Sequence, residues 1–371
     1  MKKTVLALLA AFTILLCTAC STPSGPEATS SDASDATSAS SEMTTAATLD
    51  TSASDTEISP TQTETLPETT LPPEPEAPAP TYSFNFDPYL ISYDYVTLYG
   101  PVFADTCRGL ADAFINYETE CFCPDDETFS ALLGCVDICM PYFASDAILT
   151  YDSFDAETQT LTIHYLSYSK EAHDAAYQSF VDSVTAFIQP VLSEDHSQLE
   201  RAIAVYRSFS SAVSYDLSAA DVSAHGAIVN RRGIAHSFAG ACAYLFRQAG
   251  IDAIVCGGLS SDGSAAHEWV TFSLDGKYYH ADPTYENGET GGFGLSYFGT
   301  TNAERMEAGY SPDACRVGYT GLITADTLVA DHTEFDIFRG TTAFNLVPES
   351  DTLNLSNGAS IDLSALPGGA K

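Results

Sequence analysis

Basic residues are scarce in this chain. Its 371 residues include 14 Lys and Arg against 50 Asp and Glu, which gives a formal net charge of −36. Nucleic-acid binding needs clustered Lys or Arg for phosphate contacts, so this composition argues against a nucleic-acid partner. Anionic membrane surfaces would also repel the chain, so we expect any membrane attachment to come from a lipid. The charge is compatible with a preference for cationic ligands, such as amine-bearing cell-wall peptides.

The apolar run near the start of the chain is too short to span a membrane. It follows two lysines and extends from Val5 to Leu16, which is the pattern of a secretory signal. Small residues then lead to Cys20 in a stretch that resembles a bacterial lipobox, although Cys17 stands where Leu is usual. We predict a lipoprotein signal peptide over residues 1–20 and lipidation at Cys20, which would anchor the exported protein to the outer face of the bacterial cell membrane. Cleavage near Ala19, giving a free secreted protein, is the alternative.

Large apolar residues are nearly absent from residues 21–80, where Ser, Thr, Ala, Asp, Glu and Pro dominate. Such a segment cannot bury enough surface to offset its chain entropy, so we predict a disordered acidic stalk. The rest is long enough for a sizeable α+β domain. We divide it into an N-terminal extension (81–194), a core (195–326) and a C-terminal tail (327–371) whose last residues are loose.

Periodicity gives a coarse account of the extension, which is mainly helical. Residues 110–151 are mostly helical in pattern, and residues 161–165 alternate like a half-buried strand. Residues 171–188 form an amphipathic helix that Pro190 ends. A further helix, the first of the core, begins at Asp195 as its predicted N-cap.

Half of the ten cysteines are clustered in the extension. In an exported protein such a cluster predicts one or two disulfides that tie helices together, with a connectivity that the sequence does not decide. Their spacing is not a common zinc pattern and the cluster contains no His, so we expect no metal site and no cofactor. These cysteines are Cys107, Cys121, Cys123, Cys135 and Cys139.

The stretch from residue 233 to residue 285 is the most informative in the chain. A helix runs from about residue 235 towards Gly250, where a glycine suits a helix end. Residues 252–256 follow as a buried strand. Residues 267–272 and 277–282 then form a predicted hairpin, because Asp275 and Gly276 between them are a strong turn signal.

This stretch resembles the core of the transglutaminase-like (papain-like) superfamily, in which a helix packs on an antiparallel sheet. The His-Glu-Trp sequence at residues 267–269 matches the family's His motif, and the Asp-Pro-Thr sequence at residues 282–284 matches its Asp motif. The alignment places His267 as the family base and Asp282 as the acid that orients it. It places Ala235 where the family carries its nucleophilic Cys.

The missing sulfur decides what chemistry is possible. A nucleophilic Cys reacts as a thiolate, which a helix N-terminus favours, while His takes the proton and Asp orients the imidazole. A methyl group at Ala235 cannot attack a carbonyl. Two other thiols are alternatives: Cys242 lies two helical turns further, about 10 Å along the axis, and Cys256 lies on the strand next to the predicted His strand. The competing interpretation of both is a small core residue.

Three functions are consistent with this pattern. The first is a catalytically deficient domain that binds peptide or cell-wall material in the remnant cleft, where Trp269 and Tyr215 would contact the ligand. Tyr215 also has a purely structural interpretation. The second is an active Cys-His-Asp peptidase, amidase or amide transferase that uses a displaced Cys. The third is a surface domain that keeps the core for stability alone.

Overall fold

The structure of the protein is a computed structural model that describes residues 82–260, 262–263, 266–310, 316–317, 323–324 and 328–371. The predicted signal peptide, the lipidation site Cys20 and the whole predicted stalk lie outside the described residues. No helix in the described ranges is both long and apolar enough to cross a membrane.

Helices dominate the N-terminal extension, as predicted, and short strands connect them. α2 bends at Gly100, whose φ of 85° precedes a proline inside the helix. Two small antiparallel sheets have the strand orders β1-β4-β3 and β2-β5. The elements are α2 (Tyr93–Asn116), β1 (Glu120–Phe122), α3 (Asp126–Cys139), η1 (Pro141–Ser145), β2 (Ala147–Ile148), η2 (Tyr151–Ser153), β3 (Phe154–Asp155), β4 (Thr160–Thr162), β5 (His164–Tyr165) and α4 (Lys170–Ile188).

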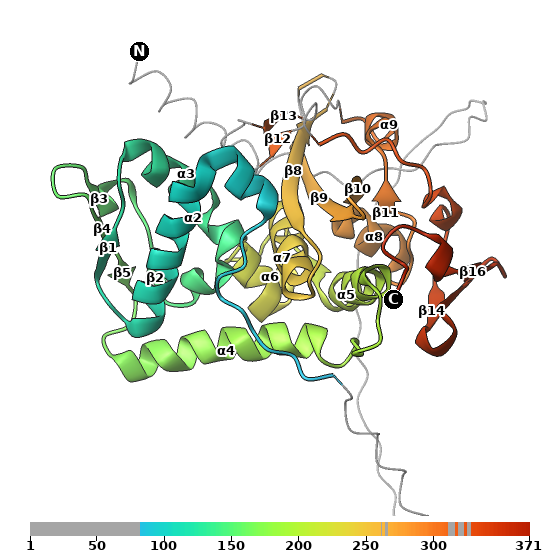
Figure 1. Cartoon of the computed structure of the whole chain (residues 1–371), viewed down its shortest axis with the longest axis horizontal. Helices are drawn as coiled ribbons and strands as arrows, with labels where there is room; N and C mark the ends of the chain where they lie inside the picture. Colours follow the sequence, from blue (N-terminus) through green and yellow to red (C-terminus); the bar gives the residue numbers. More distant parts are fainter. Residues whose placement is uncertain (1–81, 261, 264–265, 311–315, 318–322, 325–327) are drawn as a thin grey trace, which may run out of the picture. The chain divides into compact units, whose positions relative to one another are not determined.

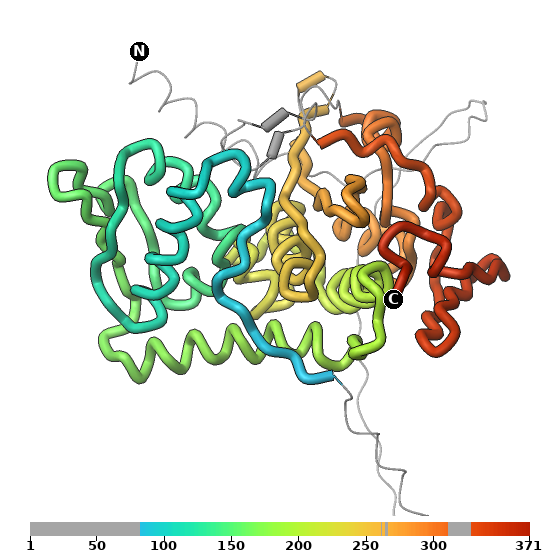
Figure 2. The backbone as a smooth tube through the Cα atoms, in the orientation of Figure 1, coloured from blue at the N-terminus to red at the C-terminus, as the bar shows by residue number. Residues whose placement is uncertain are grey.

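The long amphipathic helix is confirmed as α4, which begins after its N-cap Ser169. It packs against η1, α5, α6 and α7, so it contacts both the extension and the core (Figure 2). The predicted start of the next helix is wrong by two residues. α5 (Gln198–Ala212) has Ser197, not Asp195, as its N-cap. The reason is a capping box, in which the Ser197 hydroxyl accepts the Glu200 N–H while Glu200 Oε2 accepts the Ser197 N–H.

The core is a helix packed on an antiparallel sheet, as predicted. Six strands pair in the order β11-β10-β9-β8-β12-β13, and α7 packs against β8 and β9 (Figure 1). Gly250 follows α7 with a φ of 85°, and the Asp275–Gly276 turn joins β9 to β10. The elements are β6 (Ser214–Tyr215), α6 (Ala224–Asn230), β7 (Arg232–Gly233), α7 (Ala235–Gln248), β8 (Ala253–Leu259), β9 (Ala266–Leu274), β10 (Lys277–Ala281), α8 (Pro283–Thr290), β11 (Phe298–Thr300), α9 (Asn302–Glu307), β12 (Arg316–Val317) and β13 (Ile323–Thr324).

Side chains of β9 alternate between two differently covered faces of this sheet. Phe272 meets Phe246 of α7 with ring centroids 5.4 Å apart, so its face is the one under α7. Phe298 of β11 also contacts Phe272, at 5.1 Å. Because neighbouring strand residues point to opposite faces, His267 and Trp269 lie on the other face. Glu268 shares the face of Phe272.

The end of the chain is built into the core rather than loose. A second antiparallel sheet contains β14 (Phe344–Val347), β15 (Thr352–Leu355) and β16 (Ser360–Asp362). Beyond it, the Gly368 carbonyl accepts the Leu199 N–H at 2.8 Å, and the Gly368 N–H donates to Asp275 Oδ2 at 2.7 Å. The expectation of loose final residues is therefore wrong, because these backbone groups cap a helix and a turn that the core has already formed.

The cysteine prediction also needs correction. Every described cysteine is a free thiol, so the predicted disulfides are not formed in the structure. The five cysteines of the extension lie on α2, β1, α3 and the loop after β1, where four of them are buried. Buried cysteines pack as small apolar residues, which accounts for their place in this core.

Candidate functional site

A buried histidine–aspartate pair lies where β9 begins and β10 ends. His267 Nε2 donates to Asp282 Oδ2 at 2.7 Å, and both side chains are almost fully buried. Asp282 is the N-cap of α8, where its Oδ1 accepts the N–H groups of Thr284 and Tyr285, each at 3.1 Å. The Asp-Pro-Thr sequence is thus a helix start, with Pro at the first helical position.

Arg305 is a third member of this site that the sequence reasoning missed. Its Nη1 donates to Asp282 Oδ2 at 2.5 Å, and both side chains are buried. Burial alone would raise the pKa of Asp282, but the charges of His267 and Arg305 and the α8 hydrogen bonds outweigh it and hold that pKa well below its usual range. Asp282 is therefore a carboxylate. Arg305 lies in the six-residue helix α9, and no motif marks it.

Aromatic rings enclose the His267 imidazole. The ring stacks on Tyr285 with centroids 4.7 Å apart, and Tyr310 lies at 5.2 Å. The Arg305 guanidinium lies 5.4 Å from the Trp269 ring and 5.6 Å from the Tyr285 ring. Only 3% of His267 is exposed. The pair is consequently a packed part of the protein interior with a fixed ring orientation.

A second buried histidine holds Trp269 in place. His280 Nε2 donates to Asn302 Oδ1 at 2.7 Å, so Nδ1 is the acceptor for the Trp269 indole N–H at 3.2 Å. Burial lowers the pKa of His280 to about 4, which keeps the ring neutral and suited to that acceptor role. The indole N–H of Trp269 is thus used inside the protein.

The two alternative thiols lie in different surroundings. The Thr271 hydroxyl donates to Cys256 Sγ at 2.8 Å and also lies 2.9 Å from His280 Nδ1, so Cys256 joins the His280 network. Cys242 is fully buried on α7, where burial and then the charge of Asp282 raise its pKa well above the ordinary value. Cys242 is therefore a protonated thiol.

Ala235 is the first residue of α7 and is 5% exposed. Its neighbour His236 lies between two carboxylates from different layers: its Nδ1 is 2.6 Å from Glu268 Oε2 on β9, and its Nε2 is 3.0 Å from Asp137 Oδ2 on α3. Burial alone would lower the pKa of His236, but the two carboxylates outweigh it and raise that pKa well above the ordinary value. An imidazolium at the start of α7 therefore joins the extension to the core sheet.

The structure brings some of the predicted site residues together and separates others. His267 and Asp282 are bonded, and Trp269 lies beside them on the same face of β9. Tyr215, on β6, packs against Phe238 of α7 with centroids 6.1 Å apart, in agreement with its structural interpretation. Side chains alternate between the two faces of β9, so Glu268, and not His267, faces the first turn of α7.

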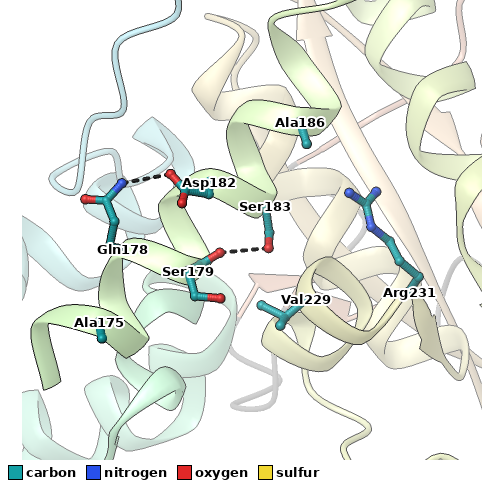
Figure 3. A pocket seen from close by; sticks show the side chains of 8 residues that line it. All are labelled: Ala175, Gln178, Ser179, Asp182, Ser183, Ala186, Val229 and Arg231. Atoms are coloured by element: carbon teal, nitrogen blue, oxygen red, sulfur yellow. Dashed lines mark hydrogen bonds between the residues drawn. The ribbon is translucent and has the colours of Figure 1, made fainter. Parts of the chain in front are cut away.

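Neither of the two cavities described in the structure includes this pair. One, of about 580 Å3, is an open hollow over α4 that Val229 and Arg231 border from α6 and the residue after it (Figure 3). In it, Gln178 donates to Asp182 and Ser183 donates to the Ser179 carbonyl. The other, of about 890 Å3, lies beside the start of α5.

The fold and the buried pair define a papain-like α+β domain. Residues 185–283 match the family model of the transglutaminase-like superfamily, so the chain carries a transglutaminase-like domain, as the sequence motifs predicted. Among curated proteins, none matches the chain.

Similar solved structures include a TGase, with 18% identity and a TM-score of 0.25, where the match covers 34% of this chain and 40% of that one. Another is the periplasmic domain of TgpA from Pseudomonas aeruginosa bound to ethylmercury, with 17% identity and a TM-score of 0.18, covering 38% of this chain and 68% of that one. The match thus spans 40% of the first structure's length.

His236 makes the stability of the protein depend on pH. Because its pKa in the folded state lies above the ordinary value of about 6.5, its contribution is fully present below about pH 6.5 and is lost as the pH rises through the folded-state pKa. In urea unfolding between pH 6 and pH 9, we expect the difference in unfolding free energy between wild type and His236→Gln to shrink as the pH rises. For His164→Gln, at an exposed position on β5, the difference from wild type should stay constant. A constant difference for His236→Gln would refute the assigned charge.

Proposed function

We propose that this protein is an exported, lipid-anchored protein whose transglutaminase-like domain is catalytically deficient and binds peptide or cell-wall material. The observation that carries the proposal is the composition of the site. Ala235 begins α7 at the family's nucleophile position, while the His267–Asp282 pair is intact and hydrogen-bonded. The base and its orienting acid are present, and the atom that would form the covalent intermediate is not.

The local electrostatics support the same proposal. A Cys at the start of a helix is activated by unpaired N–H groups and the positive end of the helix dipole. The thiol nearest along α7, Cys242, is buried and protonated. It therefore supplies no thiolate in place of the missing one.

A second function, hydrolysis by a displaced thiol, is favoured by one observation. Cys256, Thr271, His280 and Asn302 lie in a row of polar contacts. The Thr271 hydroxyl donates to Cys256 Sγ and lies 2.9 Å from His280 Nδ1, and His280 Nε2 donates to Asn302 Oδ1. Such a row contains the parts of a Cys-His-Asn arrangement. All of Cys256, Thr271 and His280 are buried, which favours a structural role.

Restoring the sulfur tests catalytic deficiency. We expect wild type to be inactive in amide-hydrolysis and amine-transfer assays. Because His267 lies on the face of β9 turned away from the first turn of α7, Ala235→Cys should gain only weak activity above background. Independently of activity, the new thiol should react with iodoacetamide at a lower pH than an ordinary thiol of pKa about 8.5, because it begins a helix beside the His236 cation. Ala241→Cys, a buried position in the middle of α7, is the matched control and should gain neither property.

Two results would contradict this reading. Wild-type activity that Cys256→Ala abolishes, with unchanged thermal unfolding, would establish the displaced-thiol enzyme instead. An Ala235→Cys thiol of ordinary reactivity would show that the start of α7 no longer activates a nucleophile.

Ligand binding is testable through the single tryptophan. Trp269 lies next to His267 and both are buried, so a peptide that binds at the pair must displace the rings around it and should change the Trp269 emission. We expect a saturable change on titration with an amine-bearing cell-wall peptide, and a weaker one with the same peptide acetylated at its amines, because the protein is strongly acidic. Trp269→Phe is the control for signal origin. If neither emission nor calorimetry detects binding, the domain is structural rather than ligand-binding.

Lipid anchoring follows from Cys20 and is tested by expression in a bacterial host with a labelled fatty acid. We expect the label in the wild-type chain and in the membrane fraction. Cys20→Ala should lose both, whereas Cys17→Ala should keep both. An unlabelled wild-type chain in the medium would establish the free secreted form.

A further inference from the structure

The cavity beside the start of α5 has both acidic and basic residues in its wall: Glu194, Asp195 and Glu349 against Arg201 and Lys371. It has a volume of about 890 Å3, within the range of small-molecule sites. It is lined by three separate parts of the core: the loop and first turn at residues 193–198 with Arg201, the end of α7 at residues 249–250, and Pro348, Glu349, Ala370 and Lys371 from the end of the chain.

The Lys371 ammonium occupies a three-sided oxygen cradle at this cavity. Its Nζ donates to the Pro348 carbonyl at 2.9 Å and pairs with Asp351 Oδ1, and it lies 3.6 Å from Glu200 Oε2. An ammonium has three N–H donors directed away from its carbon chain, so three surrounding oxygens suit it well. Here two of them come from the turn at residues 348–351, and the third, at ion-pair distance, comes from α5. A planar guanidinium fits such a tripod less well.

Glu200 is the buried charge of this cradle, and it needs a cation nearby to compensate it. Its side chain is fully buried, its Oε2 accepts the Ser197 N–H, and its Oε1 has no hydrogen-bond partner among the described residues. A buried carboxylate without a cation is costly, because its desolvation is not compensated. The Lys371 side chain, by contrast, is 34% exposed and reaches the cradle from the surface.

We propose that this cavity is a binding site for primary ammonium groups, in which the Lys371 side chain acts as a replaceable internal ligand. The class of ligand is an alkylammonium, carried either by a small amine or by a lysine-type side chain of a peptide. The backbone around Gly368 is held by its own bonds to Leu199 and Asp275, so the Lys371 side chain can leave without freeing the tail. This site is separate from the His267–Asp282 pair and does not depend on the function proposed for it.

Chemical rescue in the full chain tests the proposal. Lys371→Ala removes the side chain beyond Cβ, which n-propylammonium replaces atom for atom. We expect Lys371→Ala to lower the thermal midpoint by about 5 °C or more, and millimolar n-propylammonium chloride to restore most of it. Wild type should respond much less. Tetramethylammonium chloride at the same concentration controls for ionic strength, since it has no N–H donor.

Glu200→Gln is the matched variant, because Gln keeps the capping box with Ser197 while removing the charge. In the Glu200→Gln background, Lys371→Ala should lower the thermal midpoint little, and n-propylammonium should have no specific effect.

A lysine-containing tripeptide and its ε-acetylated form separate the two sources of the ammonium group. Rescue by the tripeptide but not by its acetylated form assigns a peptide-borne amine, and rescue by n-propylammonium alone assigns small amines.

Two results would overturn the proposal. One is equal stabilisation of Lys371→Ala by n-propylammonium and tetramethylammonium. The other is rescue that persists in the double variant. If Lys371→Ala does not fold alone, recovery of its far-ultraviolet circular dichroism by n-propylammonium is the same test, and absence of recovery overturns the proposal.

Discussion

The buried carboxylate of Asp282 is the group on which the rest of the site depends. One oxygen receives His267 and Arg305, the other caps α8, and the backbone carbonyl of the same residue accepts the Tyr206 hydroxyl of α5 at 3.0 Å. A charge buried this deeply is tolerated only when it is paired and its lone pairs are satisfied. Asp282 therefore connects β9, α8 and α9 through its side chain and α5 through its backbone carbonyl.

Paired charged and polar groups also join the extension to the core. His236 connects α3 to β9 through two carboxylates, and the Tyr278 hydroxyl of β10 donates to Asp94 of α2 at 2.7 Å. Arg247 of α7 donates to the Ile138 carbonyl of α3 at 2.6 Å. The extension thus contacts the sheet and α7 through charged and polar groups as well as apolar packing. The family match over residues 185–283 begins within α4 and leaves out these partners on α2 and α3.

Short sequence patterns predicted those features that depend on residues close together in the chain. The Asp275–Gly276 turn, Gly250 after α7, and the His267–Asp282 pairing all follow from short motifs in order, and each is present in the structure. Arg305 was not predictable from the sequence. Its role depends on a hydrogen bond to Asp282, which lies 23 residues earlier in the chain, and no spacing rule specifies that contact.

The remaining errors have physical causes of the same kind. The start of α5 was misplaced because two polar residues near it could each serve as an N-cap, and the capping box with Glu200 selects Ser197. The end of the chain was expected to be loose because its backbone partners, Leu199 and Asp275, lie far away in sequence. Cysteine spacing predicted disulfides, but it does not report whether the thiols pack as core residues.

The retained pair and the absent nucleophile are physically compatible in one protein. Removing His267 or Arg305 would leave the buried Asp282 charge partly uncompensated, a loss of about 3–5 kcal/mol for a broken buried pair. Removing Asp282 would leave the buried Arg305 without its carboxylate partner and α8 without its N-cap. A side chain at the first position of α7 does not have to balance a buried charge. Alanine has the highest helix propensity of any residue. The fold therefore places little constraint on the side chain at position 235, while the other members of the site are fixed by stability. His267, Asp282 and Arg305 are thus explained by the stability of the fold alone.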